Sequence, residues 1–207
     1  MWFYEWWGDP ATSPNAFREE LKICTGKPLT VWIDSYGGSV FAAAGIYNAL
    51  REHKGGVTVK IDGKAMSAAT IIAMAGDRIF ISPTAIMMIH NPLTYAAGYA
   101  SDLRKAADVL DTVKEAIMNA YVIKTKRSRA KISELMDAET YMSAKTAIKE
   151  GFAEEMLYSE SEAKPVEMAF NRHAILNSTN DVIKRIVGKQ KPDNSQALAL
   201  LKLQLEL

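Results

Sequence analysis

The sequence predicts an α/β domain with parallel strands. Short apolar, β-branched runs alternate with segments of helical spacing through the first two-thirds of the chain. The links between these segments are short, as is usual where strands and helices alternate around a parallel sheet. The chain has 207 residues, of which 48% are hydrophobic, so it is long enough to bury a sizeable core in one compact domain.

A glycine loop separates the first predicted strand from the helix that follows it. Residues 29–34 are a short β-branched run, and residues 39–53 have apolar side chains at helical spacing. The loop reads Ser35-Tyr36-Gly37-Gly38-Ser39, and its two glycines permit positive φ and a close approach of a ligand to the backbone. The loop lacks the pattern of a phosphate-binding loop, so by itself it indicates only a turn.

Three more short strands and a helix of small residues come next. The helix is predicted from Ser67 to about Ala75, after a turn at 62–64. The last of the strands leads directly into His90 and is stopped by the proline two residues later. The three strands are predicted over 57–61, 78–81 and 85–89.

The longest predicted helix covers residues 101–127. Its apolar stripe recurs at spacings of three and four, and Ser101 is the expected N-cap. A helix of this length extends beyond a small domain, so it is a candidate oligomerisation arm. Two shorter helices are predicted over 130–137 and 143–150, the second closed by Gly151.

The two ends of the chain depart from this pattern. Three of the four tryptophans lie within the first seven residues, and so apolar a segment is expected to pack on its own core or on a neighbouring subunit. From about residue 159 the periodicity weakens. We therefore expect residues 1–158 to form the domain and residues 159–207 to form a linker and an apolar tail that makes an interface.

Charge and composition exclude several function classes. The chain has 25 Lys and Arg against 24 Asp and Glu, which gives no long-range field for nucleic acid or an anionic membrane, so neither is an expected partner. The single cysteine, Cys24, cannot form an internal disulfide, which indicates a cytoplasmic protein with a buried structural thiol. The sequence has no GxSxG, CxxC or HExxH pattern, and it gives no reason to expect a metal or a cofactor.

Two residues are candidates for nucleophilic chemistry. His90 follows an apolar strand at the rim of the predicted sheet, where the clefts of α/β proteins open, whereas His53 and His173 lie in polar or weakly patterned segments. Ser67 begins a helix, where the dipole and the unpaired N–H groups could stabilise an oxyanion. An ordinary N-cap is the alternative for Ser67. The residues alone do not show whether the two side chains meet.

Three separated stretches resemble the ClpP peptidase family in order and spacing, over about residues 28–157: WIDSYGGSVFAAAGIYNAL, IDGKAMSAATIIAMAGDRIFISPTAIMMIHNP and ETYMSAKTAIKEGFAEE. The resemblance implies a ClpP/crotonase-like β-β-α superhelix, with the 101–127 helix as a handle between the subunits of rings that are often heptameric. It implies a serine endopeptidase that acts on polypeptides. The details GIYNALREHKG, MMIHNP and SDLRKAADVLD resemble the phage and prophage enzymes that process capsid or scaffold protein during head maturation in a bacterial host.

The resemblance also implies roles for individual residues. The family's nucleophile corresponds to Ser67, its general base to His90 and its acid to Glu139, where the housekeeping enzymes usually have aspartate. Asp137 is the alternative acid. The implied oxyanion donors are the backbone N–H groups of Gly38 and Ala68, and the implied substrate-binding strand edge lies at Gly37 and Gly38.

Two departures from the family affect the expected role. Tyr36 stands where the family commonly has proline, so the glycine loop lacks a rigid residue. The first helix is predicted close to the N-terminus, and we expect the opening strand and the loops that dock an ATP-driven unfoldase to be shortened or missing. These departures favour an ATP-independent processing enzyme.

Three other interpretations remain open from the sequence. The first is a degradative ClpP-type peptidase that works with an unfoldase. The second is a crotonase-type acyl-CoA enzyme, which shares the fold and the oxyanion hole but needs no serine–histidine pair. The third is a non-catalytic assembly protein with a vestigial triad, which only the glutamate at position 139 and the expected shortening of the N-terminus support.

Overall fold

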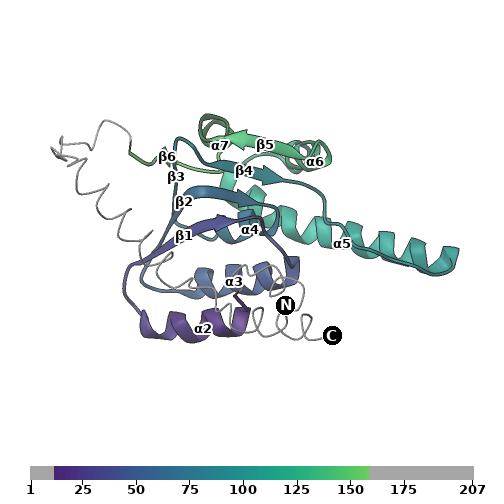
Figure 1. Ribbon diagram of the computed structural model, residues 1–207, viewed down its shortest axis with the longest axis horizontal. Coiled ribbons are helices and arrows are strands. Elements are labelled where there is room, and N and C mark those ends of the chain that lie inside the picture. Colours follow the sequence, from purple (N-terminus) through teal and green to yellow (C-terminus); the bar gives the residue numbers. More distant parts are fainter. Residues whose placement is uncertain (1–11, 159–207) are drawn as a thin grey trace, which may run out of the picture. The chain divides into compact units, whose positions relative to one another are not determined.

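The computed structural model describes residues 12–158 of the chain, which fold around one sheet (Figure 1). The predictions for the tryptophan-rich start and for the tail after residue 158 lie outside the described residues. The helices are α2 (Pro14–Ile23), α3 (Val40–Glu52), α4 (Ala68–Ala73), α5 (Ala100–Thr125), α6 (Arg129–Asp137) and α7 (Ala144–Glu150). The strands are β1 (Leu29–Ser35), β2 (Val57–Met66), β3 (Arg78–Ile81), β4 (Ile86–Ile89), β5 (Thr140–Ser143) and β6 (Glu155–Met156).

Strand β2 is the centre of the sheet and runs parallel to three neighbours. It pairs with β1, β3 and β4, and β6 pairs in parallel with β3. Only β5 is antiparallel among the strands of the described residues, and it pairs with β4. The predicted α/β class with parallel strands is confirmed.

The turn predicted at 62–64 is wrong, because β2 continues through it to Met66. The strand changes neighbours there instead. Residues 58–61 pair with β3, whereas residues 64–66 pair with β4. Asp62 and Gly63 are exposed at this change, and a Cβ on Gly63 would lie 2.6 Å from the Asp34 Oδ1. The glycine is therefore needed for close approach of β1, and it does not end the strand.

Two smaller predictions are also wrong. Helix α5 begins at Ala100 with Tyr99 in the cap position, so Ser101 lies inside the first turn. The Asp102 carboxylate accepts the Tyr99 N–H at 2.9 Å and so satisfies a donor at the start of the helix. Cys24 ends α2 and is only half-buried.

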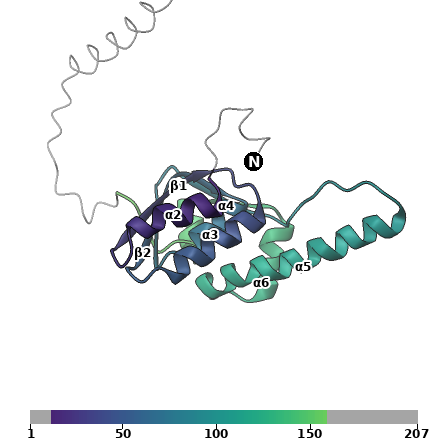
Figure 2. The ribbon, with the colours of Figure 1, turned by 90° about the horizontal axis from the view of Figure 1, so that it is seen from below.

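The core packs α3, α4 and the second half of α5 against the sheet. Tyr121 of α5 packs against Phe152, with ring centroids 5.7 Å apart, and both side chains are buried. The first half of α5 contributes no buried residue and extends away from the sheet (Figure 2). None of the helices within residues 12–158 combines the length and the apolar character needed to cross a membrane.

Candidate active site

A serine and a histidine from separate elements meet where β2 and β4 end. The Ser67 Oγ lies 2.7 Å from the His90 Nε2, within hydrogen-bond distance. Both side chains are partly buried. A neutral imidazole nitrogen at this distance can take the proton of the hydroxyl, which is the first requirement for a serine nucleophile. The other described histidine, His53, is bonded to the Lys27 carbonyl oxygen at 2.7 Å instead.

The parallel pairing of β2 and β4 brings the two residues together. Met66 is in register with Met88, and the Ser67 N–H donates to the Met88 carbonyl at 2.8 Å. Ser67 follows the last residue of β2, and His90 follows the last residue of β4. The carboxyl ends of parallel strands lie at the same edge of a sheet, so residues 23 positions apart in sequence become neighbours.

The backbone of Ser67 is in a conformation that residues other than glycine rarely adopt. Its φ is 53° and its ψ is −126°, and its side chain makes no capping bond to α4. A backbone of this kind costs about 1–3 kcal/mol and persists where the surroundings enforce it, often at active sites. Ser67 is therefore not an ordinary helix cap, because its hydroxyl is bonded to His90.

The glycine loop lies directly against Ser67. Gly37 has a φ of 101°, and a Cβ added to it would lie 2.6 Å from the Met66 carbonyl oxygen and 2.9 Å from the Ala68 nitrogen. No hydrogen bond among residues 12–158 uses the N–H of Gly38, whose φ is 146°. Ala68 is the first residue of α4, where the helix leaves the N–H unpaired. Two backbone donors are thus available beside the Ser67 hydroxyl.

Lys64 restrains this loop, a feature that the sequence did not reveal. Its Nζ lies 2.7 Å from the Asp34 Oδ1 and 4.3 Å from the centroid of the Tyr36 ring. An ammonium over an aromatic face is attracted to the ring, and the ion pair with Asp34 restricts the lysine side chain further. The lysine therefore restrains the side chain of Tyr36 at the start of the glycine loop.

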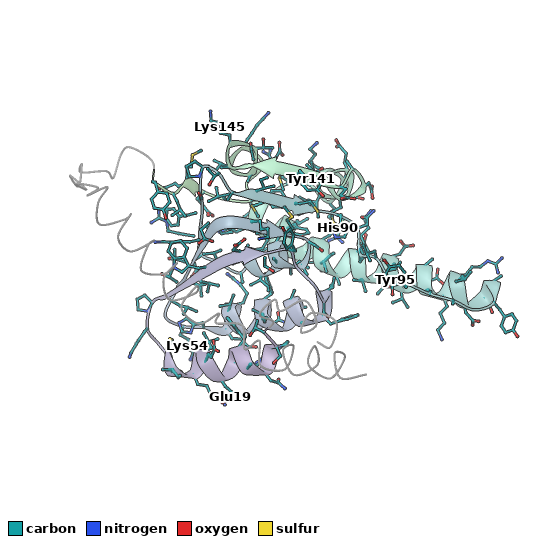
Figure 3. All side chains as sticks on the ribbon, viewed as in Figure 1. Glu19, Lys54, His90, Tyr95, Tyr141 and Lys145 are labelled. Atoms are coloured by element: carbon teal, nitrogen blue, oxygen red, sulfur yellow. The ribbon has the colours of Figure 1, made fainter. Side chains whose placement is uncertain are left out.

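Glu139 directly precedes β5, the strand that pairs with β4. Ile89 is in register with Thr140 in the last pair of this ladder, and His90 and Glu139 are the residues that follow Ile89 and precede Thr140. Figure 3 labels Tyr141 of β5 and His90, which follows β4. The Glu139 carboxylate accepts the Tyr141 hydroxyl at 3.2 Å, and this bond raises the pKa of Tyr141. Among the described residues no hydrogen bond joins Glu139 to His90.

Asp137 is occupied by other donors. The Lys114 ammonium lies 2.6 Å from its Oδ1, the Asn91 amide donates to the same oxygen at 2.9 Å, and the Ser133 hydroxyl donates to Oδ2 at 3.2 Å. The bond from Lys114, followed by that from Asn91, lowers the pKa of the Asp137 carboxyl. Its carboxylate binds α5 and the residue after His90. This leaves Glu139 as the better candidate for the imidazole.

A groove of about 550 Å³ connects the glycine loop to the first half of α5. At one end it is lined by Gly38 and Phe41, and at the other by Val109 and Leu110. Its apolar lining and its contact with a loop that has a free N–H would suit an extended chain with apolar side chains. The structure thus combines a serine hydroxyl bonded to an imidazole, two backbone N–H groups without partners among the described residues, and a groove that begins at the same glycine loop. Acyl transfer needs groups of these kinds.

Comparison with known proteins shows the family that this chain resembles. A family model described as Clp protease matches residues 21–160. The ATP-dependent Clp protease proteolytic subunit 1 of Chlamydia muridarum (strain MoPn / Nigg) is 32% identical over 161 residues, which cover 73% of this chain and 84% of that protein. The ATP-dependent Clp protease proteolytic subunit of Carsonella ruddii (strain PV) is 30% identical over 136 residues, 65% of this chain and 70% of that protein.

Proposed function

The chain belongs to the Clp protease family and is a serine-type peptidase, and we propose that Ser67, His90 and Glu139 form its catalytic triad. The observation that carries this proposal is the 2.7 Å contact between the Ser67 Oγ and the His90 Nε2. The strained backbone of Ser67 adds to it, because strain of this kind is retained where function requires it.

The proposed reaction is acyl transfer to Ser67. His90 takes the hydroxyl proton as the Ser67 Oγ bonds to a peptide carbonyl carbon, and the oxygen becomes an oxyanion between the N–H groups of Gly38 and Ala68. His90 then gives the proton to the leaving amine, and the C–N bond breaks. Water, deprotonated by the same imidazole, releases the acyl group and restores the serine.

We assign the role of the acid to Glu139 for two reasons: the register of the strands, and the hydrogen bonds that Asp137 already makes with other side chains. Glu139 directly precedes the last pair of the β4–β5 ladder and His90 directly follows it, whereas the oxygens of Asp137 already accept from three side chains. A carboxylate that accepts the Nδ1–H fixes the imidazole tautomer and stabilises the imidazolium. In this proposal the Glu139 carboxylate gives up its hydrogen bond with the Tyr141 hydroxyl and accepts a hydrogen bond from the Nδ1–H of His90.

We expect a biotinylated fluorophosphonate to label the full chain at Ser67, because the probe reacts with activated serine hydroxyls. Mass spectrometry of the digested protein locates the adduct. Ser67→Ala and His90→Ala should each abolish labelling, and Ser39→Ala, in the same glycine loop, should leave it intact. An unlabelled wild-type protein that has assembled into its oligomer would refute the proposed nucleophile.

The biological role that we propose is ATP-independent processing of capsid or scaffold protein during head maturation. The resemblance of GIYNALREHKG, MMIHNP and SDLRKAADVLD to the phage and prophage enzymes supports it. The second candidate is degradation together with an ATP-driven unfoldase, and the names of the two relatives favour it. Cleavage of a folded capsid or scaffold protein without ATP supports the first role. Cleavage restricted to short peptides and unfolded chains supports the second.

We further propose that the subunits assemble into rings of seven, with α5 at the interface between neighbouring subunits. The first half of α5 buries none of its apolar residues, and Val109 is 51% exposed. Apolar side chains gathered on an extended helix favour contact with another copy of the chain.

Val109→Glu should reduce assembly in sedimentation velocity experiments, because an unpaired charge buried at an interface costs about 3 kcal/mol or more. Val109→Ile keeps the apolar surface and is the matched control. If Val109→Glu sediments like the wild-type assembly, this part of α5 does not form the interface.

A further inference from the structure

A chain of three oxygens runs from α5 to the backbone of the candidate nucleophile. The Tyr121 hydroxyl lies 2.7 Å from the Thr70 Oγ1, and the Thr70 Oγ1 lies 2.5 Å from the Ser67 carbonyl oxygen. Thr70 is 0% exposed and Tyr121 is 1% exposed. The roles proposed above for Ser67, His90 and Glu139 use neither hydroxyl. Burying two hydroxyls costs free energy because both lose their bonds to water. A buried pair that ends on one carbonyl oxygen therefore needs a physical reason.

The direction of donation in this chain is fixed by chemistry. A carbonyl oxygen can only accept, so the Thr70 hydroxyl donates its single hydrogen to the Ser67 carbonyl. The Tyr121 hydroxyl must then be the donor to Thr70. Burial raises the pKa of Tyr121, so the phenol keeps its proton across the range in which a peptidase works. The two bonds point the same way, and each polarises the next.

The carbonyl held by this chain shares a peptide unit with a proposed oxyanion donor. The Ser67 C=O and the Ala68 N–H lie on opposite edges of one planar trans peptide, so fixing the direction of one fixes the other. The structure has no cis peptide bond among the described residues. The Thr70 backbone N–H also donates to the Ser67 carbonyl at 3.0 Å, and the hydroxyl adds a second donor from another angle. A plane held by two donors has little freedom to tilt.

We propose that Thr70 and Tyr121 are positioning residues that aim the Ala68 N–H at the oxyanion. They act through the Ser67–Ala68 peptide and touch no substrate atom. Without them the strained Ser67 backbone, with φ of 53°, could relax by rotating this peptide, and the N–H would turn away from the reacting oxygen. Since Tyr121 belongs to the buried second half of α5, this helix helps to hold the oxyanion hole in place. The inference rests on the proposed function of Ser67.

Thr70→Val removes the hydroxyl at nearly constant volume. We expect kcat for a fluorogenic peptide to fall about tenfold with little change in KM, because a misdirected oxyanion donor weakens only the transition state and complete loss of one costs more. Thr70→Ser restores the hydroxyl and should recover most of the rate. Thr125→Val is the matched control, because Thr125 is also a buried threonine bonded to a backbone carbonyl, that of Tyr121, and it does not contact the nucleophile turn.

Stability measurements distinguish two roles for these hydroxyls: orienting the Ala68 N–H, and only stabilising the core. Thr70→Val leaves the Tyr121 hydroxyl buried without a partner, so its melting temperature should fall. The double variant Thr70→Val/Tyr121→Phe has apolar groups at both positions and should regain much of that loss. The kcat of the double variant should stay as low as that of Thr70→Val. Recovery of kcat together with stability would mean that the hydroxyls only support the fold.

A pair of inhibitors tests the oxyanion directly. A peptide aldehyde reacts with the Ser67 hydroxyl, whose oxygen bonds to the aldehyde carbon while the proton passes to the new hemiacetal, and the oxygen of that adduct occupies the oxyanion hole. The matched peptide alcohol binds without forming it. Thr70→Val should weaken the aldehyde about tenfold and leave the alcohol within twofold. Equal effects on both overturn the inference, whereas a wild-type protein that binds neither the aldehyde nor the fluorophosphonate refutes the proposed nucleophile itself.

Discussion

His90→Ala is expected to lower kcat for peptide hydrolysis by about 10⁴-fold or more, with KM changed only a few-fold. Without the imidazole 2.7 Å away, the Ser67 hydroxyl keeps its proton and cannot attack at a useful rate. The substitution leaves intact the groove and the two N–H groups that we propose bind the substrate, so ground-state affinity should persist. Steady-state kinetics with a fluorogenic peptide, at enzyme concentrations high enough to measure the residual rate, give both constants.

His53→Ala is the matched control for this substitution. His53 is bonded to the Lys27 carbonyl, away from Ser67, and its loss should leave kcat close to that of the wild-type enzyme. A His90→Ala variant that keeps its fold and retains more than a tenth of the wild-type kcat would show that His90 is not the general base.

Glu139→Gln is expected to lower kcat by about 10²- to 10⁴-fold, because an amide can hold the imidazole in the wrong tautomer and gives no charge to stabilise the imidazolium. Asp137→Asn should lower kcat by less than about tenfold, since its loss weakens contacts to Lys114 and Asn91 and leaves the base in place. Parallel measurements of kcat against pH test both variants. The reverse order of effects would reassign the acid to Asp137.

The sequence predicted the elements that have strong periodicity. The strand at 29–34 and the helices at 39–53 and 143–150 agree with β1, α3 and α7 to within a residue or two. The strands β5 and β6 were not predicted, because β6 has only two residues and β5 buries a single side chain, whereas β3 and β4, which are as short as β5, each bury two. The turn at 62–64 was predicted from an Asp-Gly pair, and it failed because that glycine is needed for contact with Asp34 and not for a reversal of the chain.

The residues of the candidate site could be predicted from the sequence, but their arrangement in space could not. The resemblance named Ser67 and His90, but the register of β2 with β4 brings them together, and no local pattern reveals a register between strands 20 residues apart. The positive φ of Ser67 and the position of the lysine beside Tyr36 could not be predicted for the same reason, because both depend on contacts between distant segments. Thr70 and Tyr121 lie 51 positions apart and gave no signal in the sequence.

The change of neighbours within β2 limits how this chain can vary in length. The half of β2 that pairs with β3 belongs to the buried core, while residues 64–66 carry the strand to Ser67 along β4. One residue inserted or deleted between Ile61 and Lys64 would shift residues 64–66 along β4 and turn their side chains to the opposite face of the sheet. The serine would then leave the histidine, and the buried side chain of Ala65 would leave the core with it. The spacing from Ile61 to Ser67 is therefore constrained both by the contact of the serine with the histidine and by the packing of the core.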